Sequence, residues 1–303
     1  MKFMPQELFL KKGDEIRIIA PAKKIKKEEV AKAVAVLEAE GYKVSFGKNT
    51  FGTHHQFSGT NAEKLEDLKE AIADKNVKAI WSARGGYGSV RIIDQVDWNL
   101  FQNNKKLLIG YSDITVFHSE IQNRFIFPSL HAPMPISFKT GITNNAKNYF
   151  LNALQGDFQE ISFDAAEENI KGISRGKIIG GNLSILYSLM GSQSLSDSNG
   201  KILFIEDLDE YLYHLDRMMN GLKRAGFFEG LAGVIVGAFS DMKDNDIPFG
   251  KSAEQIIKSF FEKENIPVAL GFPAGHIENN HAIAFGMEAE LTVNKKSAKL
   301  KYL

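Results

Sequence analysis

The first half of this 303-residue chain alternates short aliphatic runs with longer amphipathic patterns, and this alternation constrains the fold more than any other feature. Each run has the length of a buried strand, and each pattern repeats apolar residues at helical spacing. Parallel strands need such crossover connections, so we predict an α/β domain whose parallel sheet carries helices on both faces. The expected strands are residues 16–20, 43–46, 79–83 and 107–110, and the expected helices lie near residues 30–40, 60–72 and 90–96.

The alternation stops near residue 155. Residues 155–171 are acidic, contain few large apolar side chains and show no period, which is typical of a linker. We therefore predict an N-terminal domain of residues 1–154, a linker of residues 155–171 and a second α/β domain of residues 172–303. Alternating polar and apolar residues around residues 294–296 predict a C-terminal hairpin. The other strands expected here are residues 176–181, 202–205, 234–237 and 268–271, with helices at residues 183–190, 211–225 and 253–264.

Composition excludes several classes of function. The 37 basic and 37 acidic residues cancel, so the chain has no surplus of positive charge to neutralise a nucleic-acid backbone. The chain also has no cysteine, which excludes disulfides, thiolate metal sites and a cysteine nucleophile. Any covalent catalysis must therefore use another side chain.

The sequence predicts no membrane segment. Residues 1–10 lack the long apolar core of a signal peptide, and no uncharged run approaches the roughly 20 apolar residues that cross a bilayer. The stretch of residues 178–190 is interrupted by two glycines and an asparagine. We therefore expect a soluble, cytoplasmic protein that binds neither nucleic acid nor membrane.

Ser112 is the most suggestive residue for chemistry. An apolar strand, residues 107–109, leads into a Gly-Tyr-Ser-Asp turn that opens a predicted helix. A serine in such a turn is exposed at the sheet edge, and the backbone N–H of Asp113 can face a developing oxyanion. The alternative is that Ser112 is an ordinary N-cap residue. Ile114 replaces the second glycine of a G-x-S-x-G elbow, which disfavours a conventional α/β-hydrolase.

A glycine-rich loop, Arg84-Gly85-Gly86-Tyr87-Gly88, follows the third predicted strand. Glycines let backbone N–H groups approach a ligand closely, so such a loop can hold an anion. Its spacing fits neither a dinucleotide-binding motif nor a P-loop. Ligands of open α/β sheets bind at the carboxyl ends of the strands, so we expect this loop beside the serine turn. Gly85 or Gly86 would then supply a second oxyanion N–H.

A serine nucleophile needs a general base. His276 follows a strand in a loop marked by glycine and proline, a position typical of functional groups. His281 is close by and is a second possibility. Three other histidines, His54, His55 and His118, are interpreted as surface or packing residues. His214 lies in a helix rich in charge.

The base in turn needs a carboxylate that fixes its tautomer. Glu206 emerges at the end of an apolar strand, which makes it a candidate. Asp207, Asp209 and Glu210 are alternatives, and the whole acidic cluster also fits a solvated helix N-terminus. If a triad is present, its chain order is serine, acid, histidine, as in α/β-hydrolases.

Five motifs together resemble the LD-carboxypeptidase family of serine peptidases, and the resemblance covers nearly the whole chain. Several motifs in the right order are far more specific than any one alone. The motifs are RGGYG at residues 84–88, GYSDIT at 110–115, GGNL at 180–183, IED at 205–207 and GH at 275–276.

The resemblance implies a Rossmann-like N-terminal domain and a β-rich α/β C-terminal domain, with the site between them, in a homodimer. It implies that Ser112 is the nucleophile, Glu206 the triad acid and His276 the base. Asp113 and one glycine of the 85–86 pair would form the oxyanion hole. Members of the family remove the terminal D-alanine from the murein tetrapeptide in cell-wall recycling. They need no metal, so we expect no cofactor.

Several alternatives stay open at this point. Arg84 and Tyr87 are candidate substrate contacts, although the Arg84 fork suits a carboxylate clamp and a structural ion pair equally. Phe285 stands where the family more often has proline, a departure that concerns substrate-side detail and not the triad. A branch of the family resembles microcin C self-immunity proteins, which cleave acyl-sulfamoyl adenylates with the same triad. A Rossmann-type binding protein, with Ser112 as a cap, is the alternative without catalysis.

Overall fold

The computed structural model describes residues 8–125, 127–164, 169–195 and 197–303. The chain forms two compact units. The first contains residues 1–118, 128–157 and 281–283, and the second contains residues 119–127, 158–280 and 284–303. Each unit therefore receives a short segment from the other half of the chain.

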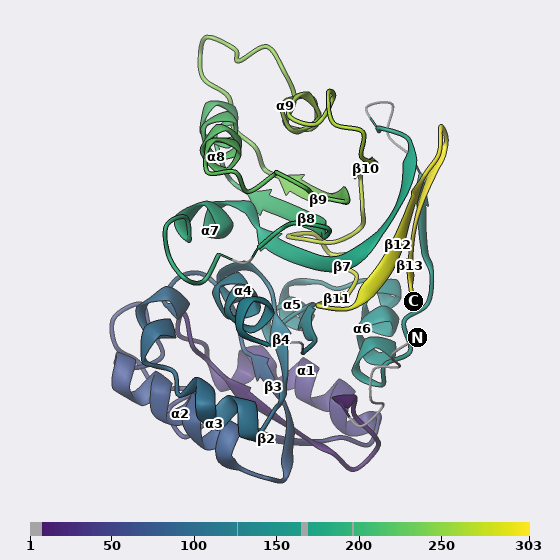
Figure 1. The fold of residues 1–303 in the computed structure, drawn as a ribbon. Helices are drawn as coiled ribbons and strands as arrows, with labels where there is room; N and C mark the ends of the chain where they lie inside the picture. Colours follow the sequence, from purple (N-terminus) through teal and green to yellow (C-terminus); the bar gives the residue numbers. More distant parts are fainter. Residues whose placement is uncertain (1–7, 126, 165–168, 196) are drawn as a thin grey trace. The chain divides into compact units, whose positions relative to one another are not determined.

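Strands β1 to β5 form the centre of the first unit and belong to a six-stranded sheet with the order β11-β5-β4-β3-β1-β2; Figure 1 labels β2, β3 and β4. β1 pairs in parallel with β2 and β3, β3 pairs with β4, and β4 pairs with β5. The carboxyl ends of these parallel strands therefore lie at one edge, where open α/β sheets bind ligands. The strands are β1 (Glu15–Ile19), β2 (Lys43–Phe46), β3 (Val77–Ser82), β4 (Leu107–Gly110), β5 (Ser129–His131) and β11 (Ile283–Phe285).

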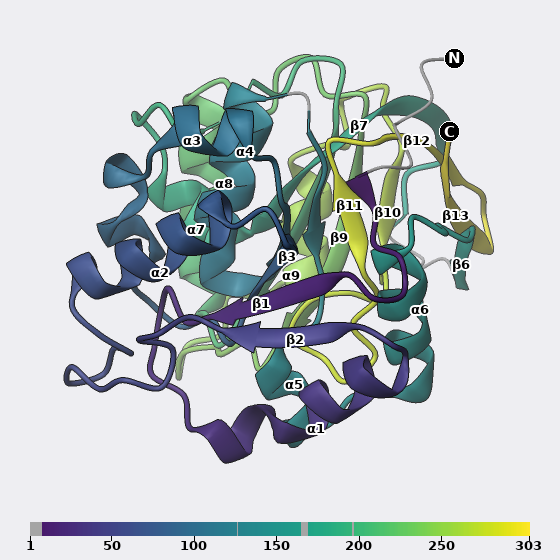
Figure 2. The ribbon, with the colours of Figure 1, turned by 90° about the horizontal axis from the view of Figure 1, so that it is seen from below.

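Helices cover both faces of this sheet, with α1 and α5 on one face and α2 and α3 on the other (Figure 2). The start of α2 has the expected capping box, because the Thr60 side chain accepts the Glu63 N–H while the Glu63 carboxylate accepts the Thr60 N–H. The helices are α1 (Lys27–Ala39), α2 (Asn61–Ala73), α3 (Trp98–Asn103), α4 (Thr115–Arg124), α5 (Pro135–Thr140) and α6 (Asn144–Leu154).

Buried aromatic rings anchor the end of β3. Trp81 is fully buried, stacks on Phe150 with ring centroids 5.1 Å apart and meets Phe138 edge-on at 5.7 Å. Its indole N–H donates to the Pro133 carbonyl at 2.9 Å, so the ring is fixed in orientation as well as depth. The glycine-rich loop that follows β3 therefore starts from a rigid support.

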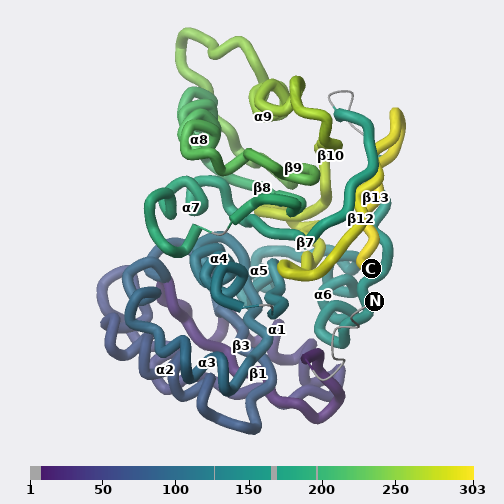
Figure 3. Tube along the Cα trace, in the orientation of Figure 1, coloured from purple at the N-terminus to yellow at the C-terminus, as the bar shows by residue number. Residues whose placement is uncertain are grey.

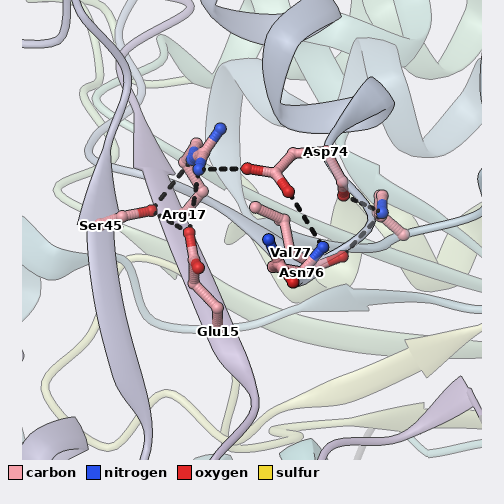
Figure 4. Close-up of polar contacts among 7 residues, drawn as sticks. Glu15, Arg17, Ser45, Asp74, Asn76 and Val77 are labelled. Carbon is pink, nitrogen blue, oxygen red and sulfur yellow. Dashed lines mark hydrogen bonds and ion pairs between the residues drawn. The ribbon is translucent and has the colours of Figure 1, made fainter.

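A polar network holds the opposite edge of the sheet, where β1 and β3 begin (Figure 4). The Arg17 guanidinium donates to Ser45, Glu15 and Asp74 at distances of 2.8–2.9 Å. The buried Lys106 ammonium donates to the carbonyls of Asp74 and Val77. These contacts join β1, β2 and the turn after α2, and so they stabilise the amino-terminal ends of the strands.

The helix predicted at residues 90–96 is wrong. This segment forms two 3₁₀ turns, η2 (Ser89–Arg91) and η3 (Ile93–Gln95). The apolar spacing is that of a helix, but the chain enters η2 from Gly88, whose φ is +142°, and the backbone hydrogen bonds of η2 and η3 span three residues instead of four, as from Ile92 to Ser89. The first N–H of the segment is accepted by Asp113, 24 residues away, a contact that the local pattern does not predict.

The second unit contains a seven-stranded sheet with the order β10-β9-β8-β7-β12-β13-β6. Neighbouring strands from β7 to β10 are parallel, whereas β12, β13 and β6 join antiparallel, as the hairpin beside β7 shows (Figure 3). The expected C-terminal hairpin is thus present. The strands are β6 (Ile161–Asp164), β7 (Gly172–Asn182), β8 (Ile202–Leu208), β9 (Gly233–Ser240), β10 (Val268–Leu270), β12 (Glu288–Val293) and β13 (Ser297–Tyr302).

Three helices of the second unit are α7 (Leu183–Ser188), α8 (Leu212–Arg224) and α9 (Ala253–Ser259). Their apolar faces and the strands β7 to β10 bury a common core that includes Leu203, Met218 and Ile257. Within the expected linker, residues 161–164 form β6 and pair with β13. This strand has no local signal, because its partner lies more than 130 residues away.

The predicted fold class is confirmed: an α/β region with a parallel sheet is followed by a second α/β region with a mixed sheet. The proposed boundaries at residues 154 and 172 stay a prediction. Among the described residues, no helix is long and apolar enough to cross a membrane.

Candidate active site

Ser112 lies in a strained turn between β4 and α4. Its φ is +64°, a left-handed conformation that L-residues rarely adopt outside special turns. Tyr111, and not Ser112, occupies the N-cap position of the short 3₁₀ turn η4 (Ser112–Ile114). The N-cap interpretation of Ser112 therefore loses its support, whereas a positive φ is the geometry of a strand-to-helix nucleophile elbow.

The glycine-rich loop lies directly against this serine. A Cβ atom on Gly85 would come within 2.9 Å of Ser112 Cβ, 3.0 Å of its Oγ and 3.4 Å of the Asp113 nitrogen. Only glycine leaves this space open. Gly86 has a φ of +111°, and a Cβ there would meet the Lys23 side chain. The predicted juxtaposition of the two loops is thus present, and Gly85 packs so closely against Ser112 that a side chain there would clash.

The second unit holds an imidazole–carboxylate pair. His276 Nδ1 is 2.7 Å from Glu206 Oε2, and the Glu206 side chain is fully buried at the end of β8. A carboxylate only accepts, so Nδ1 carries the proton and the base nitrogen of the neutral ring is Nε2. This is the orientation that a triad requires.

Backbone contacts hold the His276 loop over the carboxylate. Gly275 has a φ of +119°, and a Cβ there would lie 3.0 Å from both Cβ and Oε2 of Glu206. The Gly275 N–H donates to the buried Asn280 side chain at 2.9 Å, and the Ser240 hydroxyl donates to the His276 carbonyl at 3.1 Å. These contacts hold the loop that carries His276 beside Glu206.

Electrostatics favour the protonated imidazole. Burial alone would lower the pKa of His276, but the charge and hydrogen bond of Glu206, with a further contribution from Asp207, raise the pKa above its ordinary value. A neighbouring carboxylate that stabilises the imidazolium is what a general base needs when it receives the serine proton.

The other acidic residues near β8 have different partners. Burial, together with the adjacent Glu206 charge, raises the pKa of Asp207 to about 7. Asp207 accepts from the Asn182 amide and the Ser184 N–H, and so fixes the start of α7. Asp209 pairs with Lys243, and Glu210 pairs with His214. The geometry therefore favours Glu206 as the acid, whose catalytic role stays a prediction.

His281, the second possible base, and the histidines interpreted as surface or packing residues have other surroundings. His281 is buried, its ring stacks on Tyr149, and burial lowers its pKa to about 4. His118 is fully buried in α4, with Nδ1 2.8 Å from the Ser129 hydroxyl and Nε2 2.8 Å from the Gly110 carbonyl. His54 and His55 lie together in an exposed turn.

Arg84 lines a cavity of about 410 Å³ beside the start of α1. Its Nη1 donates to the Lys24 carbonyl at 3.3 Å, while Nε is buried and has no hydrogen-bond partner among the described residues. Within the same residues no carboxylate lies within 4.0 Å of it as an ion pair. Tyr87 is 43% exposed beside Phe57. The structural ion pair considered for Arg84 is therefore not found among the described residues.

The predicted site residues fall into two groups. Ser112, Asp113 and Gly85 lie together in the first unit, and Glu206 and His276 lie together in the second. In the part of the chain that the structure describes, no group of three or more His, Asp or Glu could hold a metal. Sequence reasoning treated His118 as a surface or packing residue and Asp207 as an alternative acid. It assigned no supporting role to Ser240 or Asn280, because their contacts with the His276 loop depend on the fold.

A serine at a nucleophile elbow and an imidazole oriented by a buried carboxylate are the components of a serine hydrolase. Profiles of the LD-carboxypeptidase N-terminal and C-terminal domains match residues 16–132 and 175–291. The chain belongs to the LD-carboxypeptidase family and is a serine-type carboxypeptidase.

Relatives and solved structures agree with this assignment. A probable murein peptide carboxypeptidase of Bacillus subtilis is 33% identical over 298 residues, covering 96% of this chain and 93% of the relative. The crystal structure of muramoyltetrapeptide carboxypeptidase from Oxalobacter formigenes has a TM-score of 0.86 and 27% identity, covering 95% of this chain and 98% of that one. A microcin C7 self-immunity protein in complex with aspartyl sulfamoyl adenosine shares the fold, with a TM-score of 0.83, 23% identity and 97% coverage of both chains.

Proposed function

We propose that this enzyme removes the terminal D-alanine from murein tetrapeptides with a triad of Ser112, His276 and Glu206. The 2.7 Å pair between His276 and the buried Glu206 carries the proposal, because it leaves the imidazole with the tautomer that a general base needs. The strained φ of Ser112 and the close approach of Gly85 to its side chain support the nucleophile.

The chemistry proceeds in two halves. His276 takes the Ser112 proton while Oγ attacks the carbonyl carbon of the residue before D-alanine, giving a tetrahedral oxyanion. The backbone N–H groups of Asp113 and of Gly85 or Gly86 stabilise that charge. The imidazolium then protonates the departing D-alanine amine, and water hydrolyses the acyl-enzyme with His276 again as base.

The connectivity of the chain supports a site built from one copy of the protein. Helix α4 starts three residues after Ser112 in the first unit, and from Ser119 onward it belongs to the second. His276 in turn lies five residues before His281, which belongs to the first unit. Five residues span at most about 18 Å, so the chain keeps His276 within that distance of His281.

Arg84 and Tyr87 are the proposed substrate contacts. A carboxypeptidase reads the terminal carboxylate, which lies only two bonds beyond the scissile nitrogen. Arg84 directly precedes Gly85, and its guanidinium forms no ion pair among the described residues, so its charge is available for a carboxylate. Tyr87 offers an exposed ring beside it for the peptide.

The biological setting follows from the family. Release of D-alanine from murein tetrapeptides would serve cell-wall recycling in the cytoplasm, and the enzyme would act as a homodimer. Relatives named as murein peptide carboxypeptidases support the substrate class. Light scattering on a size-exclusion column tests the assembly: a mass near twice 33.7 kDa is expected, and a mass near 33.7 kDa contradicts a dimer.

The decisive experiment incubates wild-type protein and Ser112→Ala with L-Ala-γ-D-Glu-meso-diaminopimelate-D-Ala in the presence of EDTA and follows D-alanine by mass spectrometry. Wild type should release D-alanine, and Ser112→Ala should lose at least about 10³-fold in turnover. His276→Ala should lose a similar factor. His214→Ala is the matched control, because His214 also pairs through Nδ1 with a carboxylate but lies outside the proposed triad.

Two outcomes would redirect the proposal. Equal turnover by wild type and Ser112→Ala would remove the serine mechanism. No release by either protein would favour the acyl-sulfamoyl adenylate reaction or a binding role, and a peptidyl sulfamoyl adenylate is then the next substrate. Saturable binding of that compound without turnover would identify a binding protein.

A further inference from the structure

Two buried charged residues lie behind the glycine-rich loop, and neither belongs to the proposed triad. Lys64 of α2 is only 2% exposed, and Asp113 at the elbow is only 1% exposed. Burying a charge is costly unless nearby groups compensate it. The contacts of these two side chains therefore indicate which part of the structure depends on their burial.

The Asp113 carboxylate ties the loop to the elbow. Its Oδ2 accepts the backbone N–H of Ser89 at 2.9 Å, and Ser89 is the residue directly after the loop. The backbone N–H of the same Asp113 belongs to the proposed oxyanion hole, and its nitrogen lies 3.4 Å from the position that a Cβ on Gly85 would take. One residue thus contributes an oxyanion donor through its backbone and fastens the second donor loop through its side chain.

Lys64 contacts the same end of the loop from the other side. Its ammonium is 3.4 Å from the Gly88 carbonyl, and a Cβ on Gly88 would lie 3.2 Å from Nζ. The ammonium also lies 4.9 Å from the centre of the Phe57 ring. Its field favours the ionised form of Asp113, which burial disfavours. The two buried charges therefore stabilise each other around residues 88 and 89.

We propose that Lys64 and Asp113 are positioning residues that clamp residues 85–88 against the nucleophile elbow and so set the geometry of the oxyanion hole. The inference rests on the proposed function, because it assigns the clamp to that oxyanion. Preorganised donors stabilise a transition state only when they are held where the charge develops. Loosening the clamp should therefore weaken transition-state binding more than substrate binding.

The test compares Lys64→Met, Lys64→Arg and Asp113→Ala with wild type. Methionine keeps the buried stem of Lys64 but removes the charge, and arginine restores it. We expect Lys64→Met and Asp113→Ala each to lower kcat by about 10- to 100-fold, somewhat less than the loss of a whole oxyanion donor. Lys64→Arg should recover most of the activity. The double variant should be no more than a few-fold worse than the worse single variant, because both act on one loop.

Two binding measurements separate positioning from a general structural role. One uses a tripeptide boronic acid in which boron replaces the scissile carbonyl carbon, since its tetrahedral adduct with Ser112 mimics the oxyanion. The other measures the intact tetrapeptide bound to each variant in a Ser112→Ala background. The clamp predicts that boronate affinity falls in parallel with kcat while tetrapeptide affinity changes less than about threefold. Lys69→Met, an exposed lysine on the same helix, is the control.

The outcomes are distinguishable. Unchanged kcat and boronate affinity in Lys64→Met would overturn the clamp, as would equal losses of boronate and tetrapeptide affinity together with a lowered Tm. If Ser112→Ala is as active as wild type, the proposed function fails first. If Ser112→Ala is inactive and Lys64→Met is fully active, the triad stands and only the clamp is overturned.

Discussion

Ser112 holds a backbone conformation that costs about 1–3 kcal/mol for a residue with a Cβ atom. Neighbouring structure maintains it, since the Gly110 carbonyl is fixed by His118 and the next residue, Asp113, is fixed by its contact with Ser89. The strain places Oγ at the tip of the turn, beside Gly85. Strain of this kind is retained where it serves function.

Removal of the strain should stabilise the protein at the expense of activity. Ser112→Gly should be more stable to urea than Ser112→Ala by about 1 kcal/mol, because glycine adopts a positive φ without steric cost whereas alanine does not. Both variants should lack D-alanine release. Equal stability of the two variants would show that the turn carries no strain.

The His276–Glu206 pair predicts the acid limb of the pH–rate profile. A general base must be neutral, and Glu206 raises the pKa of His276 against the effect of burial, so kcat/KM should rise through a pKa above about 6.5. Glu206→Gln removes the charge that holds the proton. We expect its acid limb to move to lower pH while kcat falls by at least about 10³-fold.

The measurement is kcat/KM for the tetrapeptide between pH 5 and 9 in both proteins. His214→Gln is the control, since the profile should not depend on the His214–Glu210 pair. An acid limb that stays in place in Glu206→Gln would mean that another group sets it.

At the scale of elements, the sequence predicted those features that depend on local patterns. The strands β1, β3 and β4 and the helices α1 and α2 lie close to their expected positions, because alternation and capping are encoded in neighbouring residues. The segment 89–95 and strand β6 depend instead on contacts with Asp113 and β13 that are distant in sequence. Period and propensity carry no information about such partners.

One element-scale prediction concerns α4, whose fully buried His118 braces the end of β4. The Gly110 carbonyl can only accept, so His118 donates from Nε2 and accepts the Ser129 hydroxyl at Nδ1. This neutral ring has a pKa lowered by burial to about 4. In the unfolded chain His118 has a pKa near 6.5, so between pH 6.5 and 4 it binds a proton that it does not bind in the folded state. The free energy of unfolding therefore falls as pH drops from about 6.5 toward 4.

Urea unfolding at pH 7.5 and pH 5 measures this effect. His118 should account for about 2 kcal/mol of the stability that wild type loses between these values. His118→Gln keeps an N–H donor for the Gly110 carbonyl but cannot titrate, so it should lose about 2 kcal/mol less over the same interval. The exposed His54→Gln should follow wild type. A parallel loss in His118→Gln and wild type would contradict this role.

For the whole molecule, sequence reasoning identified the candidate site residues better than the contacts that support them. Motif spacing drew attention to Ser112, Glu206 and His276, although 94 residues separate the serine from the acid and 70 separate the acid from the base. The positive φ of Ser112 and the burial of Lys64 have no signature in sequence, because both result from packing between elements. The halves of the site also belong to different compact units.

This division makes one prediction about the whole molecule. If the triad forms within one chain, then Ser112→Ala and His276→Ala proteins, each inactive, should stay inactive when they are unfolded together, refolded and assayed as a mixture. A site shared between two copies would instead regain one complete triad in mixed dimers and about a quarter of wild-type turnover, because half of randomly paired dimers are mixed and each has one of two sites intact. The short connections at Ser119 and His281 lead us to expect no recovery. Wild-type protein taken through the same refolding provides the reference, and recovered D-alanine release near one quarter of that reference would assign the histidine to the partner copy.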